Sequence, residues 1–162
     1  HPADAAWFGL TDGGLARLKF RMTYTGTRSH ESRHQELPAV FLEPRFGTLV
    51  FCAKGAAAWQ DAPLTRRQPG FPNEGADFSE PWAAWEEPGG QAVGIYFPHT
   101  TEATVYRVTG TGQGDCSYIA PVRSMALTPG LVFEHETILA TGTVAQIRSV
   151  FTALHRQTQK SP

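Results

Sequence analysis

The chain has 162 residues, of which 41% are hydrophobic and 18% are charged, and its formal net charge is −1 at pH 7. This length and apolar content are typical of one globular domain with a core of its own. The near-neutral charge argues against a nucleic-acid partner or an anionic membrane surface. No apolar run approaches the length that a transmembrane helix needs.

The start of the chain and its two cysteines bear on its processing and on its redox compartment. The chain opens with His1-Pro2 and has no signal-peptide pattern, which indicates a processed mature chain, an excised domain or a cloning choice. Cys52 and Cys116 are compatible either with one disulfide or with two buried thiols, so they assign no redox compartment.

The composition favours an all-β protein with many turns, since it holds 16 glycines, 12 prolines and 11% aromatic residues. Leu18 to Tyr24 is the first clear element, because apolar residues alternate with polar ones at the period of a strand with one wet face. Similar patterns predict further strands at Ala39 to Leu42, Gly47 to Ala53, Ala92 to Phe97, Ala103 to Val108, Ser117 to Leu127 and Leu131 to Thr141.

A polar segment between the first two strands contains the zinc-protease pattern HExxH, as His30-Glu31-x-x-His34. On a helix these two imidazoles would share one face and could bind one zinc ion. The flanking residues are polar, however, and Gly26 and Pro38 confine any helix to a few turns. We therefore interpret the segment as a polar loop that leads into a strand, expect no metal, and keep a zinc metalloprotease as a minor alternative.

The segment from Lys54 to Pro88 shows little periodicity and holds five prolines and three tryptophans. We expect a long irregular loop there, and such loops are usually functional in compact domains. Its tryptophans would either pin the loop to the core or line a binding surface.

The last element is a predicted helix near Thr143 to His155. Thr143 and Gln146 match a capping box, and apolar residues follow at helical spacing. The predicted architecture is a single all-β domain over residues 1–162, a mainly antiparallel β-sandwich with one C-terminal α-helix and a disordered tail at 157–162.

Six motifs occur once each, in this order, along the chain: QELPAV (Gln35 to Val40), PGFPNE (Pro69 to Glu74), EPWAAW (Glu80 to Trp85), GIYFP (Gly94 to Pro98), DCSYIAP (Asp115 to Pro121) and the ending from Thr128 to Arg148. With these motifs the chain resembles a largely uncharacterised group of secreted bacterial proteins that accompany polysaccharide breakdown. The resemblance implies a galactose-mutarotase-like supersandwich and a secreted or periplasmic location. A complete supersandwich is longer than this chain, which implies either a part of a larger protein with additional domains or a reduced version.

The chemistry of sugar recognition also indicates candidate binding residues, independently of the family resemblance. Sugar rings stack on aromatic faces, and their hydroxyl groups bind to carboxylates and guanidinium groups. The candidate substrate-binding residues are Trp59, Trp82, Tyr96, Tyr118, Arg123 and Glu74. For each aromatic residue the alternative is a position in the core, which is the more common one for such side chains. We therefore predict a poly- or oligosaccharide partner and no cofactor.

Whether the chain is an enzyme stays open at this point. A glycoside hydrolase would need two carboxyl groups across the sugar, for which Glu36 with Glu80 or Glu74 is the candidate pair. A polysaccharide lyase or an epimerase would use His34 or His99 to take a proton, with an arginine that neutralises the sugar acid. A non-catalytic glycan-binding or accessory module is the alternative, since one fold supports both.

Overall fold

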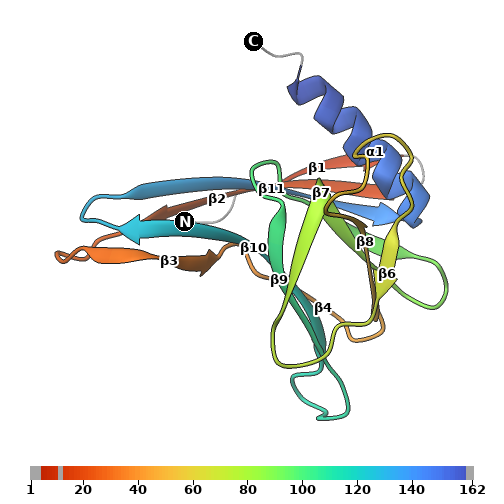
Figure 1. The fold of residues 1–162 in the computed structure, drawn as a ribbon, viewed down its shortest axis with the longest axis horizontal. Helices are drawn as coiled ribbons and strands as arrows, with labels where there is room; N and C mark the ends of the chain where they lie inside the picture. The colour runs from red at the N-terminus through yellow and green to blue at the C-terminus, as the bar shows by residue number, and fades with distance from the viewer. Residues whose placement is uncertain (1–4, 11–12, 160–162) are drawn as a thin grey trace.

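The computed structural model of the chain describes residues 5–10 and 13–159. Within them lie eleven strands and one helix: β1 (Ala5–Leu10), β2 (Gly13–Thr23), β3 (His30–Glu36), β4 (Val40–Leu42), β5 (Thr48–Ala53), β6 (Thr65–Arg67), β7 (Glu74–Glu86), β8 (Ala92–Tyr96), β9 (Glu102–Val108), β10 (Cys116–Leu127), β11 (Val132–Gly142) and α1 (Val144–Thr158). The described strand pairs are all antiparallel. This confirms the predicted mainly antiparallel β-sandwich with a C-terminal helix (Figure 1).

The strands form one curled sheet in the order β1-β2-β11-β8-β7-β9-β10-β3, with β4 on β10, and with β5 between β6 and β7. The sheet changes direction along β7, which pairs with β9 through its first residues and with β5 and β8 through its last ones. A register shift lies between Phe51 and Ala53 at the bend. Such an irregularity lets one long strand pass from one layer of a sandwich to the other.

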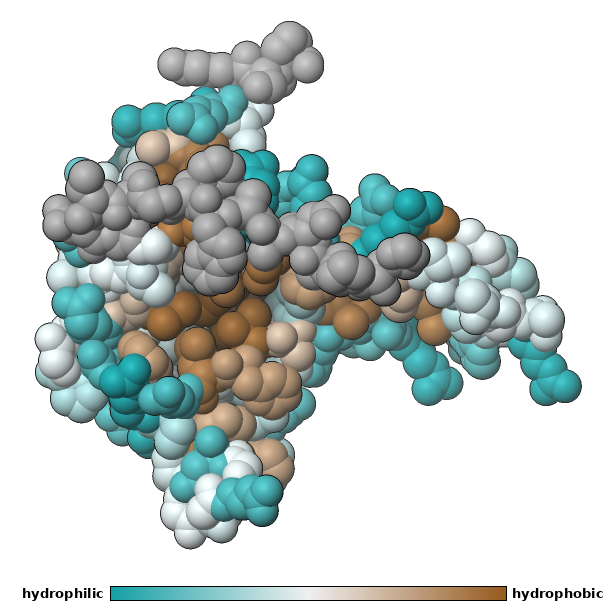
Figure 2. All heavy atoms as spheres, turned by 180° about the vertical axis from the view of Figure 1, so that it is seen from behind, coloured by the Kyte–Doolittle hydropathy of each residue, from teal (hydrophilic) through white to brown (hydrophobic). Residues whose placement is uncertain are grey.

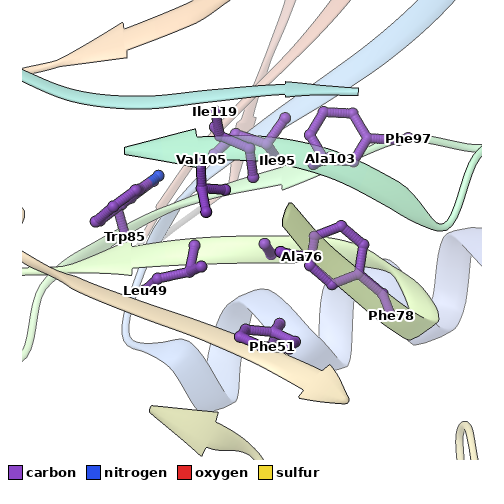
Figure 3. Packing of buried hydrophobic residues seen from close by; sticks show 11 residues of the cluster. Leu49, Phe51, Ala76, Phe78, Trp85, Ile95, Phe97, Ala103, Val105 and Ile119 are labelled. Carbon is purple, nitrogen blue, oxygen red and sulfur yellow. The ribbon is translucent and has the colours of Figure 1, made fainter. Parts of the chain in front are cut away.

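The main core fills the inside of this curl. Buried side chains from β5, β7, β8, β9 and β10 converge there, as Figure 3 shows for Leu49, Phe78, Trp85, Val105 and Ile119 among others. At roughly 25 cal/mol per Å² of apolar area, this cluster supplies much of the free energy that holds the two layers together.

The helix α1 covers the other face of β7, β8 and β11 through a second cluster that includes Trp82, Ile147 and Phe151. Its start matches the predicted capping box, because Thr143 and Gln146 bond to each other reciprocally. With the main core on one face and α1 on the other, residues 82–85 of β7 are all buried.

Away from α1, two strand pairs extend into an arm, β2 with β11 in one layer and β3 with β10 in the other (Figure 1). The inner faces of the layers meet, since Arg123 of β10 lies over the ring of Phe133 of β11. From behind, the apolar residues gather on the middle of the body, whereas the far end of the arm is coloured white to teal and is less apolar (Figure 2).

Two predictions about individual segments are wrong. The segment 54–88 is not one irregular loop, because β6 and the central strand β7 lie in it. Burial on both faces removes the alternation by which a strand is recognised. Residues 30–36 are the edge strand β3 rather than a loop, and since residues 30–34 are exposed on both faces no apolar pattern marks them.

Other predictions fall at the ends and at the cysteines. The helix continues to Thr158, where a tail was predicted from Gln157, while residues 160–162 lie outside the described residues. Cys52 and Cys116 are both free thiols, Cys52 buried and Cys116 partly buried. No helix in the described part of the chain is long and apolar enough to cross a membrane.

Candidate functional site: an aromatic ladder beside Glu36

Four aromatic rings line up across the outer face of the layer that contains β4, β9 and β10. Phe41 of β4 contacts Tyr118 of β10 edge-on at a centroid distance of 4.9 Å, and Tyr118 stacks on Tyr106 of β9 at 4.3 Å. Phe71, in the loop before β7, meets Tyr106 edge-on at 5.7 Å. We call Phe41, Tyr118, Tyr106 and Phe71 the aromatic ladder.

Strand register places the ladder on this face. Tyr118 lies directly opposite both Phe41 and Tyr106 in the neighbouring strands. The adjacent residues Val105 and Ile119 point the other way, into the main core. Because successive side chains of a strand alternate between its faces, the three strand rings share the face turned away from the core.

The two ends of the ladder are open to solvent. Phe41 is 62% exposed and Phe71 68% exposed, whereas Tyr118 between the other rings is only 6% exposed. Large apolar side chains that are exposed together with polar neighbours are typical of a binding surface. Phe41 and Phe71 therefore present apolar rings at the surface, one at each end of the ladder.

Glu36, at the end of β3, lies beside the ladder. The hydroxyl of Tyr118 donates a 2.7 Å hydrogen bond to Oε2 of Glu36. Burial raises the pKa of Tyr118, and the neighbouring Glu36 carboxylate raises it further. Tyr118 is thus a permanent donor that fixes the carboxylate, and the other carboxylate oxygen can accept a hydrogen bond from a ligand hydroxyl.

The two other predicted residues nearby have different positions. Glu74 accepts a 2.7 Å hydrogen bond from the backbone N–H of Gly70, so it closes the turn that carries Phe71. It also lies 3.6 Å from Arg67. His34 is exposed on β3 and, two residues before Glu36, shares its side of the strand. Glu74 thus positions the ladder rather than joining it.

Glu80 and Trp82 lie far from solvent, against α1. Both have 0% exposure, and the indole N–H of Trp82 donates to Glu80 at 2.7 Å. Glu80 also accepts from the backbone N–H of Trp59 and from the guanidinium of Arg148. A carboxylate enclosed in this way has no room for a substrate, so Glu80 and Trp82 serve here to join the sheet to the helix.

Trp59 and Tyr96 are also placed at the helix. Trp59 is half-buried and stacks on His155 of α1 at 4.4 Å between centroids. Tyr96 is 2% exposed, and its hydroxyl lies 3.5 Å from Nδ1 of His155. Of the aromatic residues predicted to bind a substrate, Trp59 alone keeps part of its surface open next to α1, and Tyr118 alone belongs to the ladder.

His99 and Arg123 come together at the edge of the arm, on the opposite side of β10 from the ladder. Arg123 donates a 2.8 Å hydrogen bond to the backbone carbonyl of His99. The ring of His99 lies 6.3 Å from that of His135 on β11. Burial lowers the pKa of His135 to about 4, and the charges of Arg123 and His99 act in the same direction.

A polar cleft of about 460 Å³ opens at another place, where none of the predicted site residues lies. Its walls include Arg45, Arg107, Glu86 and Glu87. The two acids already have partners, because Glu86 pairs with Arg66 and Glu87 with Arg45. Both acids are thus engaged in salt bridges, Arg107 donates to the backbone carbonyl of Pro44, and no aromatic ring lines the cleft.

The zinc alternative is wrong on geometry. His30 and His34 lie in a strand, where four residues span about 13 Å, so the two imidazoles cannot meet at one ion. No group of three or more His, Cys, Asp or Glu side chains is placed to hold a metal ion among the residues that the structure describes.

Comparisons with known proteins concern the fold. No protein-family model matches the chain, and none of the curated proteins does. The galactosidase domain of alpha-galactosidase-sucrose kinase, AgaSK, superposes with a TM-score of 0.55 at 17% identity, over 80% of this chain and 20% of that one. At this identity the likeness shows the sandwich fold alone.

Two further solved structures are more distant. They are a protein described as an aldose 1-epimerase from Escherichia coli (TM-score 0.46, 16% identity) and a galactose mutarotase related enzyme from Lactobacillus acidophilus (TM-score 0.45, 8% identity). Each match covers 86% of this chain and 60% of the other protein. The chain thus spans a fifth of the galactosidase chain and 60% of the other two.

Three of the four ladder residues were not predicted from the sequence: Phe41, Tyr106 and Phe71. A signal was available for Tyr106, since Val105 and Tyr106 are adjacent in a predicted strand and only one can face the core. Phe71 lies in a proline-rich turn without periodicity, and no sequence signal marks it.

Proposed function

We propose that this chain is a carbohydrate-binding β-sandwich domain that takes a polysaccharide or oligosaccharide on the aromatic ladder. The observation that carries the proposal is the pair of exposed rings, Phe41 and Phe71, at the ends of a four-ring ladder that has a fixed carboxylate beside it. The apolar face of a pyranose ring stacks on such rings, while a sugar hydroxyl donates to Glu36.

The ladder suits an extended chain of sugars better than a single one. Its two exposed rings, Phe41 and Phe71, lie at opposite ends, and the stacked pair Tyr118 and Tyr106 separates them, so a ligand that contacts both has to extend along the surface. The similarity in fold to a galactosidase domain supports this proposal, since that domain belongs to a carbohydrate-active protein.

Binding without cleavage is favoured over hydrolysis. A glycosidase needs two carboxyl groups about 5–10 Å apart across the scissile bond. Glu80 is enclosed by Arg148 and Trp82, and Glu74 is engaged by Gly70 and Arg67, so neither predicted partner is presented to a sugar beside Glu36. A secreted or periplasmic location and additional domains in the same protein belong to this proposal.

The experiment is affinity electrophoresis in gels that contain a panel of neutral and acidic polysaccharides. Phe41→Ala and Phe71→Ala should each weaken binding at least about tenfold, which corresponds to 1.4 kcal/mol, a value within the range for burying an apolar ring. Both side chains are exposed, so the melting temperature should change little.

Val132→Ala is the matched control, because Val132 is a 44% exposed apolar residue on β11, outside the ladder. Its binding should equal that of the unmodified protein. Retardation by no polysaccharide of the panel would refute the proposal, and so would an equal loss in the control.

A further inference from the structure

The inside of the arm holds nitrogen-bearing side chains without acceptors. His135 on β11 is 3% exposed, and neither Nδ1 nor Nε2 of its ring has a hydrogen-bond partner among the described residues. Thr137, two residues further along the same side of β11, has a buried hydroxyl that likewise lacks one in that part of the chain. Each buried polar atom without a hydrogen bond lowers the stability of the fold by about 1–3 kcal/mol, so a ligand that bonds to these two residues would recover part of this free energy.

Arg123 and His99 complete the cluster from the facing layer. The Arg123 guanidinium lies 5.9 Å from the centroid of the Phe133 ring, and its one hydrogen bond to the described residues goes to the carbonyl of His99. Thr100 donates a 3.0 Å hydrogen bond to the carbonyl of Val122, which holds the His99 loop against β10. The remaining guanidinium donors are therefore held next to the two imidazoles.

We propose that Arg123, His99 and His135 form a second binding site, for a carboxylate group, on the opposite side of β10 from the aromatic ladder. Arg123 supplies the positive charge, and the carboxylate accepts from its free N–H groups and from a ring N–H of His135. His99, which is exposed, lies with its ring 6.3 Å from that of His135 and contacts the carboxylate from the solvent side. The site is independent of the proposed glycan surface.

The charge of the cluster selects a monoanion. With its pKa lowered to about 4, mainly by burial, His135 is neutral at pH 7, so Arg123 is the principal cation of the cluster. The acids of β11 do not cancel this charge, because Glu134 and Glu136 alternate with His135 and pair on the other face with Arg21 and Arg17. A planar carboxylate matches the guanidinium fork, whereas a phosphate dianion would keep an uncompensated charge.

The test follows the imidazole resonances of His99 and His135 by NMR at pH 7 while glucuronate, acetate, phosphate or neutral glucose is added. Glucuronate or acetate should shift both rings in a saturable way, and glucose should not. Tighter binding of glucuronate identifies a sugar acid as the source of the carboxylate, and equal binding identifies a simple carboxylic acid. No shift with either carboxylate, or tighter binding of phosphate, would overturn the proposal.

Variants connect the shifts to the site. Arg123→Gln should weaken carboxylate binding at least about tenfold. Arg123→Lys keeps the charge without the fork and should give an intermediate loss, which serves if the glutamine variant does not fold. Arg21→Gln removes the same charge from the outer face of the arm and should bind like the unmodified protein. An equal loss in Arg21→Gln would show a general charge effect and refute the site.

Discussion

Arg148 of α1 donates to both carboxylate oxygens of Glu80 on β7, through Nη2 at 2.5 Å and through Nε at 3.2 Å. Glu80 is completely buried, and the backbone of Trp59 and the indole of Trp82 donate to it as well. Burial pushes the pKa of Glu80 upward, but these hydrogen bonds outweigh it, so the pKa lies below its ordinary value. One carboxylate thus joins the helix, the sheet and the loop before β6.

Arg148→Ala should therefore destabilise the protein severely. It leaves the Glu80 carboxylate buried with its main partner gone, and breaking a buried pair from one side costs about 3–5 kcal/mol. Arg156→Ala, on the exposed last turn of the same helix, should cost under about 1 kcal/mol. Urea denaturation measures both, and similar midpoints for the two variants would show that the pair contributes little.

Gly94→Ala should also destabilise, because α1 packs directly on the backbone of β8 there. A Cβ at Gly94 would overlap with the side chains of Ile147 and Phe151. Overpacking of this kind costs about 1–3 kcal/mol. A Cβ at Gly75 in β7 meets nothing within 4 Å, so Gly75→Ala serves as the control and should keep the melting temperature. Equal melting temperatures for the two variants would mean that the helix adjusts its position without cost.

Alternation between an exposed and a buried face marks β2, β9 and the last residues of β10, and α1 shows both its apolar spacing and its capping box. β5 and β8 are buried on nearly all positions, and short apolar runs mark them instead. β7 has core on both faces and β3 has solvent on both faces of its first five residues, so alternation is absent from each for opposite reasons.

The candidate site was predictable only in part. Glu36 and Tyr118 were each chosen as candidates from local features, but their contact depends on the pairing of β3 with β10, and the two residues are 82 positions apart in the chain. Glu80 was predicted as a sugar-site acid because carboxylates are rarely buried, and Trp82 because aromatic faces stack on sugar rings. The partly buried Arg148 that satisfies Glu80 lies 68 residues away, and no local pattern reveals it.

Trp82→Ala should fail as a test of sugar binding, since it removes a core residue. The indole has 0% exposure and packs on Phe151 of α1. Removal of a buried tryptophan costs about 3–5 kcal/mol, and here Glu80 also loses a donor. Trp59→Ala removes a half-buried ring and should cost less. Thermal unfolding measures both variants, and a Trp82→Ala protein as stable as the unmodified one would contradict the position of this side chain.

His135 should make stability depend on pH in a defined window. Its pKa is 6.5 when exposed in the unfolded chain and about 4 in the folded protein, chiefly because of burial and then because of the nearby Arg123 and His99. Above pH 6.5 the ring is neutral in both states and adds no pH dependence. As the pH falls from 6.5 to 4, His135 becomes protonated in the unfolded chain but stays neutral in the folded protein. The free energy of unfolding therefore decreases by up to about 3 kcal/mol.

His135→Phe keeps an aromatic ring beside Phe133 and removes this titration. Subtracting the urea-derived free energy of the variant from that of the unmodified protein should give a difference that is level above pH 6.5 and falls between pH 6.5 and 4. His34→Gln, at an exposed position of β3, should retain the pH dependence of the unmodified protein. A difference that stays constant from pH 7 to 4 would mean that His135 takes up its proton in the folded protein as readily as in the unfolded chain. Protonation inside the arm would then need a counter-charge, and the site next to Arg123 would have to hold an anion already.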